Sequence, residues 1–348
     1  LLGSNLATDV PIYILALVIG IYQIFHASIN LVTYVLYRKN KIRPRFRFLL
    51  DGLVLVFLGG TSLLSSTGNS VFQLFVLGAY FFLYGLSNIR DGFLFEGEIG
   101  KNHLKRRIRI SLPIVLAALI PARTLAKINK FMQENADERE DIHLGMVKSG
   151  KTAELEIFVH TAETSLFSAI GHVDICYQGR VISYGNYDPS SETLFGMVGD
   201  GVLYFCDRDK YIDLCKRESQ KTLFGYGIDL TPEMEKAVQK KLAELKQLTI
   251  PWEPSADKIM TGDGKEDYTY AYKIRHETDG ELYKFIKSKF KSYFVLSTNC
   301  VLLADTIVGQ AGTDILSPKG FIAPGTYQAY LNREFEKPNS IVVSKHVY

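Results

Sequence analysis

The sequence has few residues that suit a metal site or a disulfide framework. It contains four cysteines: Cys176, Cys206, Cys215 and Cys300. They form no C-x-x-C pair, and no histidine follows them at zinc-finger spacing, so we expect no structural metal site. A disulfide between Cys206 and Cys215 is possible, but the sequence alone leaves it open. Cys176 fits a buried strand position, which is the common environment of a free cysteine.

An excess of charge of one sign is also missing. The formal net charge is +3 over 348 residues, so bulk charge gives no reason to expect a nucleic-acid partner. The sequence lacks the signal-peptide pattern of a basic head, a short apolar run and a small-residue cleavage site. It opens LLGSNLATDV without a methionine, and we expect further residues upstream.

Long apolar runs, by contrast, fill the first third of the chain. The four longest cover residues 11–37, 48–64, 71–86 and 110–128. A helix that crosses a bilayer needs about 20 mostly apolar residues. The first run is long enough, the next two need flanking residues, and the fourth is interrupted by Pro113 and Pro121 and could lie partly in the interface. We therefore predict a transmembrane helical domain of about four spans over residues 1–128, rather than a soluble bundle of buried helices.

The loops between these runs predict the orientation in the membrane. Residues 38–47 read RKNKIRPRFR, and residues 100–109 read GKNHLKRRIR, whereas residues 65–70 carry no charge. Basic loops stay in the cytoplasm. With four spans, the first and third loops lie inside, and the remainder of the chain emerges on the extracytoplasmic face. The sequence thus predicts a multi-pass cell-membrane protein with an external C-terminal domain.

The hydrophobic periodicity changes after a polar connector at residues 129–152. Strand-like alternation is found at residues 153–162, 171–177, 180–187, 201–206 and 268–275. A helix is predicted at residues 231–245, where Thr231 is a suitable N-cap and Pro232 suits the first helical position. A second helix is predicted at residues 280–290. These patterns indicate an α+β domain over residues 153–348.

Cys300 has the setting that a nucleophilic thiol needs. It follows a Ser-Thr-Asn run ending at Asn299 and opens an apolar segment that stops at Gly309 or Gly312. We expect it in the first turn of a helix, where unpaired amides and the positive end of the dipole favour the thiolate. The same amides can bind the oxyanion of a tetrahedral intermediate. The alternative is a buried cysteine packed at a helix start.

His172 is the histidine best suited to act with that thiol. It follows Gly171 in a strand, and a glycine there lets another backbone or a substrate approach closely. A neutral imidazole beside a thiol can take its proton. His160, which ends the preceding strand, is the competing candidate. A lone strand histidine can equally be structural.

The third member of a triad is expected on the strand that follows. This strand should form a hairpin with the histidine strand across residues 178–180. Tyr184, Asn186 or Asp188 could orient the imidazole, and we favour Tyr184 or Asn186. Strand alternation places these three side chains opposite Ser183 and Tyr187. The alternative is that they are turn and edge residues.

The segment AELEIFVHTAETSLFSAIGHVDICYQGRVISYGNYD resembles the opening of the Lnb N-terminal periplasmic domain family. YGIDLTPEME and the Asn-Cys of STNC are also similar to that family. The order of histidine before cysteine resembles circularly permuted papain-like proteins of the NlpC/P60 superfamily, which include lecithin-retinol-acyltransferase-like proteins. The resemblance covers residues 153–331 and implies a permuted papain-like fold with an antiparallel sheet. It also implies that His172 is the general base and Cys300 the nucleophile, with Gly171 and Asn299 supporting the site.

These observations predict a membrane-anchored, extracytoplasmic, cysteine-dependent acyl hydrolase or acyltransferase. Its substrate would be a membrane lipid or a lipid-linked molecule such as a lipoprotein, because the anchor keeps the domain near the bilayer and relatives with this residue order carry out lipid-acyl chemistry. We predict no cofactor and no metal, and protein partners stay open. Two alternatives remain. One is a peptidase or amidase acting on the cell wall, the commonest activity of NlpC/P60 relatives, and the other is a non-catalytic membrane-anchored scaffold.

Three structural features would separate these functions. An acyl enzyme should have an apolar groove at Cys300, lined by residues such as Phe224, Phe294 or Phe321. A peptidase should have an open polar cleft. A scaffold should leave His172 and Cys300 too far apart for a hydrogen bond, even through one water molecule.

Overall fold

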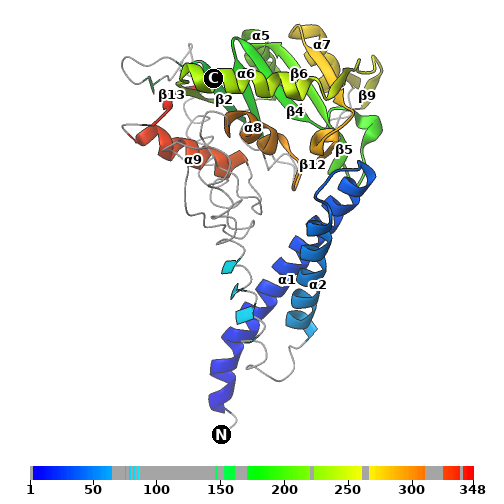
Figure 1. Cartoon of the computed structure of the whole chain (residues 1–348), viewed down its shortest axis with the longest axis vertical. Coiled ribbons are helices and arrows are strands. Elements are labelled where there is room, and N and C mark those ends of the chain that lie inside the picture. Colours follow the sequence, from blue (N-terminus) through cyan, green and yellow to red (C-terminus); the bar gives the residue numbers. More distant parts are fainter. Residues whose placement is uncertain are drawn as a thin grey trace. The chain divides into compact units, whose positions relative to one another are not determined.

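The protein divides into two compact units, an N-terminal helical unit and a larger C-terminal unit built on a sheet. A computed structural model describes the following residues: 3–64, isolated positions between 75 and 86, 146–147, 153–160, 171–219, 223–260, 266–309, 324–337 and 340–348. Figure 1 shows the course of the chain.

The N-terminal unit is a pair of long helices that pack against each other. α1 covers Gly3–Lys39 and α2 covers Phe46–Leu64. Glycines allow the close approach: a Cβ added at Gly59 would lie 2.9 Å from Cγ1 of Ile24, and one added at Gly52 would lie 2.9 Å from Cδ2 of Leu31. Small residues at a helix interface have this role in membrane proteins, where packing rather than water exclusion holds helices together.

Both helices have the length and composition of membrane spans. Ala16–Lys39 within α1 and Phe46–Leu64 are each apolar enough to cross a bilayer. Many large apolar side chains on both helices are exposed, as expected of surfaces that face lipid. The two helices therefore indicate membrane association. The predicted fourth span lies outside the described residues, and the third lies outside them except for the isolated positions between 75 and 86.

The C-terminal unit is built on one large antiparallel sheet. Its order is β1-β13-β7-β2-β3-β4-β6-β11-β8. The strands are β1 Met146–Val147, β2 Leu155–His160, β3 His172–Tyr177, β4 Arg180–Gly185, β6 Val202–Asp207, β7 Leu223–Ile228, β8 Thr249–Pro251, β11 Glu281–Phe285 and β13 Val342–Val347. Two small two-stranded sheets complete the unit: β5 (Val198–Asp200) with β12 (Ser292–Phe294), and β9 (Lys258–Met260) with β10 (Glu266–Tyr268).

Helices cover both faces of the large sheet (Figure 1). α6 (Pro232–Lys246), α8 (Cys300–Val308) and α9 (Pro324–Glu336) contribute to one apolar core. α5 (Arg208–Ser219) and α7 (Tyr270–Glu277) contribute to a second core on the other face. Alternation along β3 serves both cores, because Val173 and Ile175 belong to the first and Cys176 belongs to the second. The described part of the unit is therefore a three-layer arrangement of helices, sheet and helices.

Several predicted elements are confirmed. The β3–β4 hairpin turns across Gln178 and Gly179, both with positive φ, as a tight turn matched to strand twist requires. In α6, the Thr231 side chain accepts from the amide of Met234, and Pro232 begins the helix. α8 begins at Cys300 and has its C-cap at Gly309.

Two predicted elements are wrong. Residues 280–290 contain strand β11 rather than a helix, because β11 pairs with both β6 and β8, and these pairings prevail over local helical periodicity. Residues 268–275 contain the start of α7 rather than a strand. The Thr269 side chain accepts from the amide of Tyr272 and so caps this helix.

The four cysteines are free thiols and all are buried. The possible disulfide between Cys206 and Cys215 is therefore not formed. Cys176 is a buried residue of β3, as predicted. Burial raises the pKa of Cys176 to about 12, so this thiol stays protonated at physiological pH.

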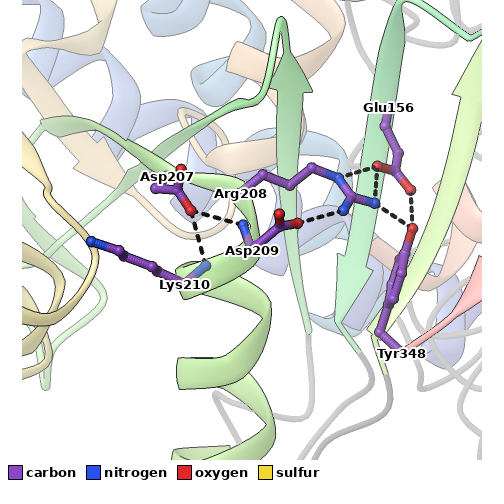
Figure 2. A network of polar contacts seen from close by, with 6 residues as sticks. All are labelled: Glu156, Asp207, Arg208, Asp209, Lys210 and Tyr348. Carbon is purple, nitrogen blue, oxygen red and sulfur yellow. Dashed lines mark hydrogen bonds and ion pairs between the residues drawn. The ribbon is translucent and has the colours of Figure 1, made fainter. Parts of the chain in front are cut away.

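A polar network ties the last residue of the sequence into the sheet (Figure 2). Arg208, at the start of α5, donates from Nε and Nη2 to Oε2 of Glu156 at 3.1 and 3.0 Å. Tyr348 accepts from Nη2 of Arg208 at 2.6 Å and donates to Oε1 of Glu156 at 2.8 Å. The side chain of Asp207 accepts from the amides of Asp209 and Lys210. This network joins three elements that are distant in the sequence, β2, α5 and the end of β13.

Candidate active site

The structure brings His172 and Cys300 together from elements far apart in the sequence. His172 is the first residue of β3 and Cys300 is the first residue of α8. The two side chains are close enough that Cys300 contributes to the raised pKa of His172. Cys300 is almost entirely buried, whereas 26% of the His172 side chain is exposed. The imidazole is therefore the more exposed of the two groups.

Asp174 is the acidic partner of His172. Its Oδ1 lies 2.8 Å from Nε2 of His172, an ion-pair distance, and its side chain has no exposed surface. The two residues are two positions apart on β3, so strand alternation directs both side chains to the same face. A buried carboxylate needs partners that offset its loss of hydration, and His172 is one of them.

Two further neighbours of His172 are Ser183, in β4, and Tyr187, which follows the end of that strand. Ser183 Oγ lies 2.9 Å from Nε2 of His172, and Tyr187 Oη lies 3.1 Å from the same nitrogen. The hydroxyls of Ser183 and Tyr187 are 2.8 Å apart. Three oxygens, including that of Asp174, therefore surround one imidazole nitrogen.

These contacts differ from the expected ones. The structure places Ser183 and Tyr187 next to the imidazole, not Tyr184 or Asn186. Tyr184 faces the opposite core, where its hydroxyl donates to the carbonyl of Phe290 at 2.9 Å. Asn186 Oδ1 accepts from Ser191 Oγ at 3.5 Å, beside the small sheet.

Asp188, the third member of the same expected set, is engaged with a cation. It forms an ion pair with Lys284, and it caps a short turn by accepting from the amide of Ser190. The physical reason for the difference is the hairpin register. Ile175 pairs with Ile182, which sets Asp174 beside Ser183 on a shared face.

His160 and Tyr211 complete the surroundings of Asp174. His160 Nε2 lies 2.7 Å from Oδ2 of Asp174, and the Tyr211 hydroxyl donates to the same oxygen at 2.5 Å. The Tyr211 hydroxyl and His160 Nε2 are 3.1 Å apart. His160, the competing candidate from the sequence, thus contacts the same carboxylate from the cross-strand position opposite His172. Asp174 is held between two imidazoles.

The charges in this cluster support one another. Burial opposes a charged imidazolium, but the charge of Asp174 and the interaction with Cys300 outweigh it and raise the pKa of His172 well above its ordinary value. Burial alone would raise the pKa of Asp174. The charge of His172 and the hydrogen bonds from His160 and His172 prevail and hold that pKa far below its usual range. Imidazolium and carboxylate are therefore the favoured forms near neutral pH.

The start of α8 is fixed by its N-cap. The Asn299 side chain accepts from the amide of Leu302 at 3.1 Å and donates to the carbonyl of Val295 at 3.0 Å. Asn299 therefore supports the site by capping. The amides of Cys300 and Val301 precede the first intrahelical hydrogen bond. Gly171 has a φ of 76°, a conformation that glycine adopts without strain, immediately before His172.

Tyr293 is a second polar neighbour of the thiol. It belongs to β12, seven residues before Cys300 in the sequence, and the two side chains interact electrostatically. Its ring packs on that of Tyr184 at a centroid distance of 5.5 Å. Burial and the charge of Cys300 raise the pKa of Tyr293 well above its ordinary value. The hydroxyl therefore remains a hydrogen-bond donor at physiological pH.

Two of the three phenylalanines expected to line an apolar groove at Cys300 lie in the described part of the chain. Phe224 and Phe294 are both buried in the C-terminal unit, so these side chains belong to its packed interior. Phe321 lies outside the described residues. A tight turn at residues 194–197 contacts the segment that precedes α8, where the Met197 carbonyl accepts from the amide of Val295 at 3.0 Å.

Asp174, Ser183, Tyr187, Tyr211 and Tyr293 were not recognised from the sequence. Asp174 had a detectable signal, since His-x-Asp in a strand places both side chains on one face. Ser183 also had one, because a turn of the two residues Gln178 and Gly179 within the predicted connection 178–180 fixes the hairpin register. Tyr211 and Tyr293 lie on other elements, and no local pattern connects them with the histidine.

Within the residues that the structure describes, no group of three or more His, Cys, Asp or Glu side chains has the arrangement of a metal site. Comparison with protein-family models, curated proteins and solved structures gives no match to this chain. The case for its function therefore depends on the geometry of the site.

Proposed function

We propose that the C-terminal unit is a cysteine-dependent acyl-transfer enzyme, with Cys300 as nucleophile, His172 as base and Asp174 as the orienting acid. The observation that carries this proposal is the 2.8 Å ion pair between His172 and the fully buried Asp174, beside Cys300, which is close enough to contribute to the raised pKa of His172. This proximity of thiol and imidazole supports an enzyme over a scaffold. In nucleophilic catalysis the nucleophile generally contacts a base, and the base in turn contacts a group that orients it.

Acylation of the thiol is the first half of the proposed reaction. Sγ of Cys300 bonds to the carbonyl carbon of an ester or amide, and the thiol proton passes to His172. The tetrahedral intermediate then breaks its bond to the alkoxide or amine leaving group. That group takes the proton from the imidazolium, which leaves an acyl-thioester on Cys300.

Deacylation restores the free thiol. Water or an acceptor amine gives a proton to His172 and bonds to the thioester carbonyl carbon. The carbon–sulfur bond breaks, and the proton returns from His172 to the thiolate. The product is a carboxylic acid or a transferred acyl group.

The neighbours of the two catalytic residues fit these steps. Nε2 of His172 contacts Asp174, Ser183 and Tyr187, so we assign Nδ1 as the nitrogen that exchanges the proton with the thiol.

Three groups at the thiol are the proposed donors to the oxyanion, because each can donate a hydrogen bond. They are the backbone amides of Cys300 and Val301 and the hydroxyl of Tyr293.

An exposed apolar turn that is hydrogen-bonded to the segment before α8 supports a lipid-acyl substrate. Thr193 and Val198 exchange backbone hydrogen bonds of 2.8 and 3.2 Å and so close the turn. Leu194 and Phe195 at its tip have φ values of 50° and 58°, which non-glycine residues adopt only at a cost. Phe195 is 92% exposed. A strained turn that presents an aromatic ring to solvent suits contact with acyl chains or a lipid surface.

The membrane anchor supports the same substrate class. The two apolar helices hold the chain at a bilayer, so a membrane lipid or a lipid-linked molecule is always nearby. We further propose that the unit has the permuted papain-like fold, that the chain has four spans, and that the basic loop 38–47 is cytoplasmic and the C-terminal unit extracytoplasmic. A protease confined to the outer face should then cut the connector at residues 129–152, and complete protection would argue against this orientation.

The proposal is tested with chromogenic esters and peptides. Purified full-length chain is given p-nitrophenyl esters of acetate and palmitate, and cell-wall muropeptides in a separate assay. We expect release of p-nitrophenol, with the long-chain ester preferred, and loss of turnover in Cys300→Ser but not in the matched buried-thiol control Cys176→Ser. Cleavage of muropeptides alone would favour the NlpC/P60-type peptidase. No turnover of any of these substrates, with Cys300 inert to alkylation, would contradict the enzymatic proposal.

A further inference from the structure

The connection between α1 and α2 carries an unusual concentration of positive charge. Within residues 38–47, six side chains are cationic and none is acidic: Arg38, Lys39, Lys41, Arg43, Arg45 and Arg47. The first four are exposed and the other two are half-buried. In the described part of the chain, none of the six forms an ion pair with a carboxylate. Among the residues that the structure describes, no carboxylate therefore neutralises their charge.

These cations are carried by an ordered turn. The amide of Asn40 donates to the carbonyl of Leu36 at 2.9 Å, and that of Ile42 donates to the carbonyl of Tyr37 at 2.8 Å, which extends the end of α1. The amide of Phe48 donates to the carbonyl of Arg45 at 3.1 Å as α2 begins. The charges thus lie at one end of a packed helical pair. Because its backbone is already ordered, this segment loses little backbone conformational entropy on binding a ligand.

Aromatic rings surround the same end. Tyr37 packs edge-on against Phe48 at a centroid distance of 5.0 Å, and Tyr34 lies 6.4 Å from Phe46. The guanidinium of Arg47 lies 5.1 Å from the ring centre of Phe48. Aromatic rings followed by cations, at the end of an apolar helix, are typical of the level at which a bilayer meets water.

We propose that residues 38–47 bind the headgroups of anionic phospholipids. Phosphate-bearing headgroups complement a cluster of six unneutralised cations, of which Arg side chains suit bidentate contact with phosphate oxygens. The apolar surfaces of α1 and α2 place lipids around the pair and supply the headgroups at high local concentration. This site concerns the helical unit alone, and it does not depend on the acyl-transfer reaction proposed for the C-terminal unit.

The site is tested with lipid vesicles of defined composition. The full-length chain is reconstituted in mixed phosphatidylcholine and phosphatidylglycerol, extracted in mild detergent, and analysed for co-purifying lipids by mass spectrometry. Wild type should retain phosphatidylglycerol in excess over its share of the vesicle. The triple variant Arg43→Gln/Arg45→Gln/Arg47→Gln should lose at least about tenfold of this enrichment, because each basic residue near an anionic surface contributes separately. Raising the salt concentration should weaken the wild-type enrichment.

A control variant separates local from bulk charge. Lys216→Gln/Lys236→Gln/Lys240→Gln makes the same change in net charge at exposed positions of the C-terminal unit, and it should keep the wild-type enrichment. If the Arg variant does not fold, as judged by circular dichroism, Lys39→Gln/Lys41→Gln/Arg43→Gln takes its place. Equal enrichment in wild type and variant, an equal loss in the control, or full displacement of the lipid by millimolar inorganic phosphate would overturn the proposal. Retained enrichment in Cys300→Ser is expected, and it keeps this test distinct from the enzymatic one.

Discussion

Nε2 of His172 lies 2.8 Å from Oδ1 of Asp174, two residues further along the same strand. The carboxylate has no exposed surface, and it also contacts His160 and Tyr211. A buried carboxylate held by several donors has a defined orientation, and it passes that orientation to the imidazole. The carboxylate is thus held by an imidazole from its own strand, β3, by a second imidazole from β2 and by a tyrosine hydroxyl from α5.

Replacing Asp174 with asparagine tests this relationship. Asp174→Asn keeps the shape of the side chain but removes the negative charge that favours the imidazolium, so we expect turnover to fall by about 100-fold or more. The rate of Cys300 alkylation at neutral pH should fall as well, because less thiolate is paired with imidazolium. The measurement is the initial rate of p-nitrophenyl ester hydrolysis, with circular dichroism as a check on folding. Unchanged rates in a folded variant would remove Asp174 from the site.

The raised pKa of His172 predicts how stability depends on pH. A group whose pKa is higher in the folded than in the unfolded state stabilises the fold below its unfolded pKa, and this contribution is lost as pH rises through the folded pKa. The difference in melting temperature between wild type and His172→Gln should therefore be largest near about pH 6, close to the ordinary imidazole value. It should shrink on the alkaline side of the raised pKa.

Asp174 determines how the stability of the fold changes at low pH. Its pKa is lowered in the folded state, so its contribution is present above the unfolded carboxyl value and is lost as pH falls through the folded one. Thermal melting of full-length chain in detergent, scanned across pH, measures both limbs. A wild-type minus His172→Gln difference that grows steadily toward alkaline pH would contradict the assigned charges.

The exposed turn at Phe195 predicts a chain-length effect. Phe195→Ser removes an aromatic ring that is 92% exposed and packs little in the folded unit, so the fold should keep its stability. We expect KM for p-nitrophenyl palmitate to rise several-fold, because the apolar contact contributes about as much as burying one large side chain, while the acetate ester is unaffected. Met260→Ser, at a residue that is 68% exposed on β9, is the matched control. An equal effect on both esters, or an equal effect of Met260→Ser, would count against a role in lipid contact.

Neighbouring glycines of α2 test the packing of the helical pair. A Cβ at Gly59 would meet Ile24 at 2.9 Å, whereas one at Gly60 would meet nothing within 4 Å. Gly59→Leu should destabilise the pair by about 1–3 kcal/mol through overpacking, and Gly60→Leu should have little effect. The midpoint of thermal loss of helical circular dichroism in micelles measures the difference. Equal midpoints would show that the two helices do not pack through Gly59.

The sequence predicted helix starts and the hairpin turn correctly where neighbouring residues determine them. The caps at Thr231 and Asn299 and the turn at Gln178 were readable, because each depends on residues within four positions of one another. The expectation that Cys300 opens a helix was correct for this reason. Cys300 and His172 lie on elements that are far apart in the chain. Their pairing was inferred from the chemistry of the two residue types and from a family resemblance, because no local pattern connects them.

The errors have tertiary causes. Residues 281–285 have a mixed pattern that long-range pairing with β6 and β8 turns into a strand, and sequence periodicity carries no record of such partners. The choice of Tyr184 over Ser183 failed because the register between β3 and β4 was not followed from the turn to the site. With Tyr177 opposite Arg180, counting back three residues on β3 and forward three on β4 places Asp174 beside Ser183.

The most direct test of the central claim is to identify what becomes attached to Cys300. Full-length chain is incubated with a palmitoyl p-nitrophenyl ester, quenched in acid, digested and analysed by mass spectrometry, with and without hydroxylamine treatment. We expect a hydroxylamine-sensitive palmitoyl adduct on Cys300 that is absent in His172→Ala. Cys176 should stay unmodified, since burial raises the pKa of its thiol to about 12. An unmodified Cys300 in folded protein, or equal acylation of Cys176, would contradict a nucleophile activated by His172.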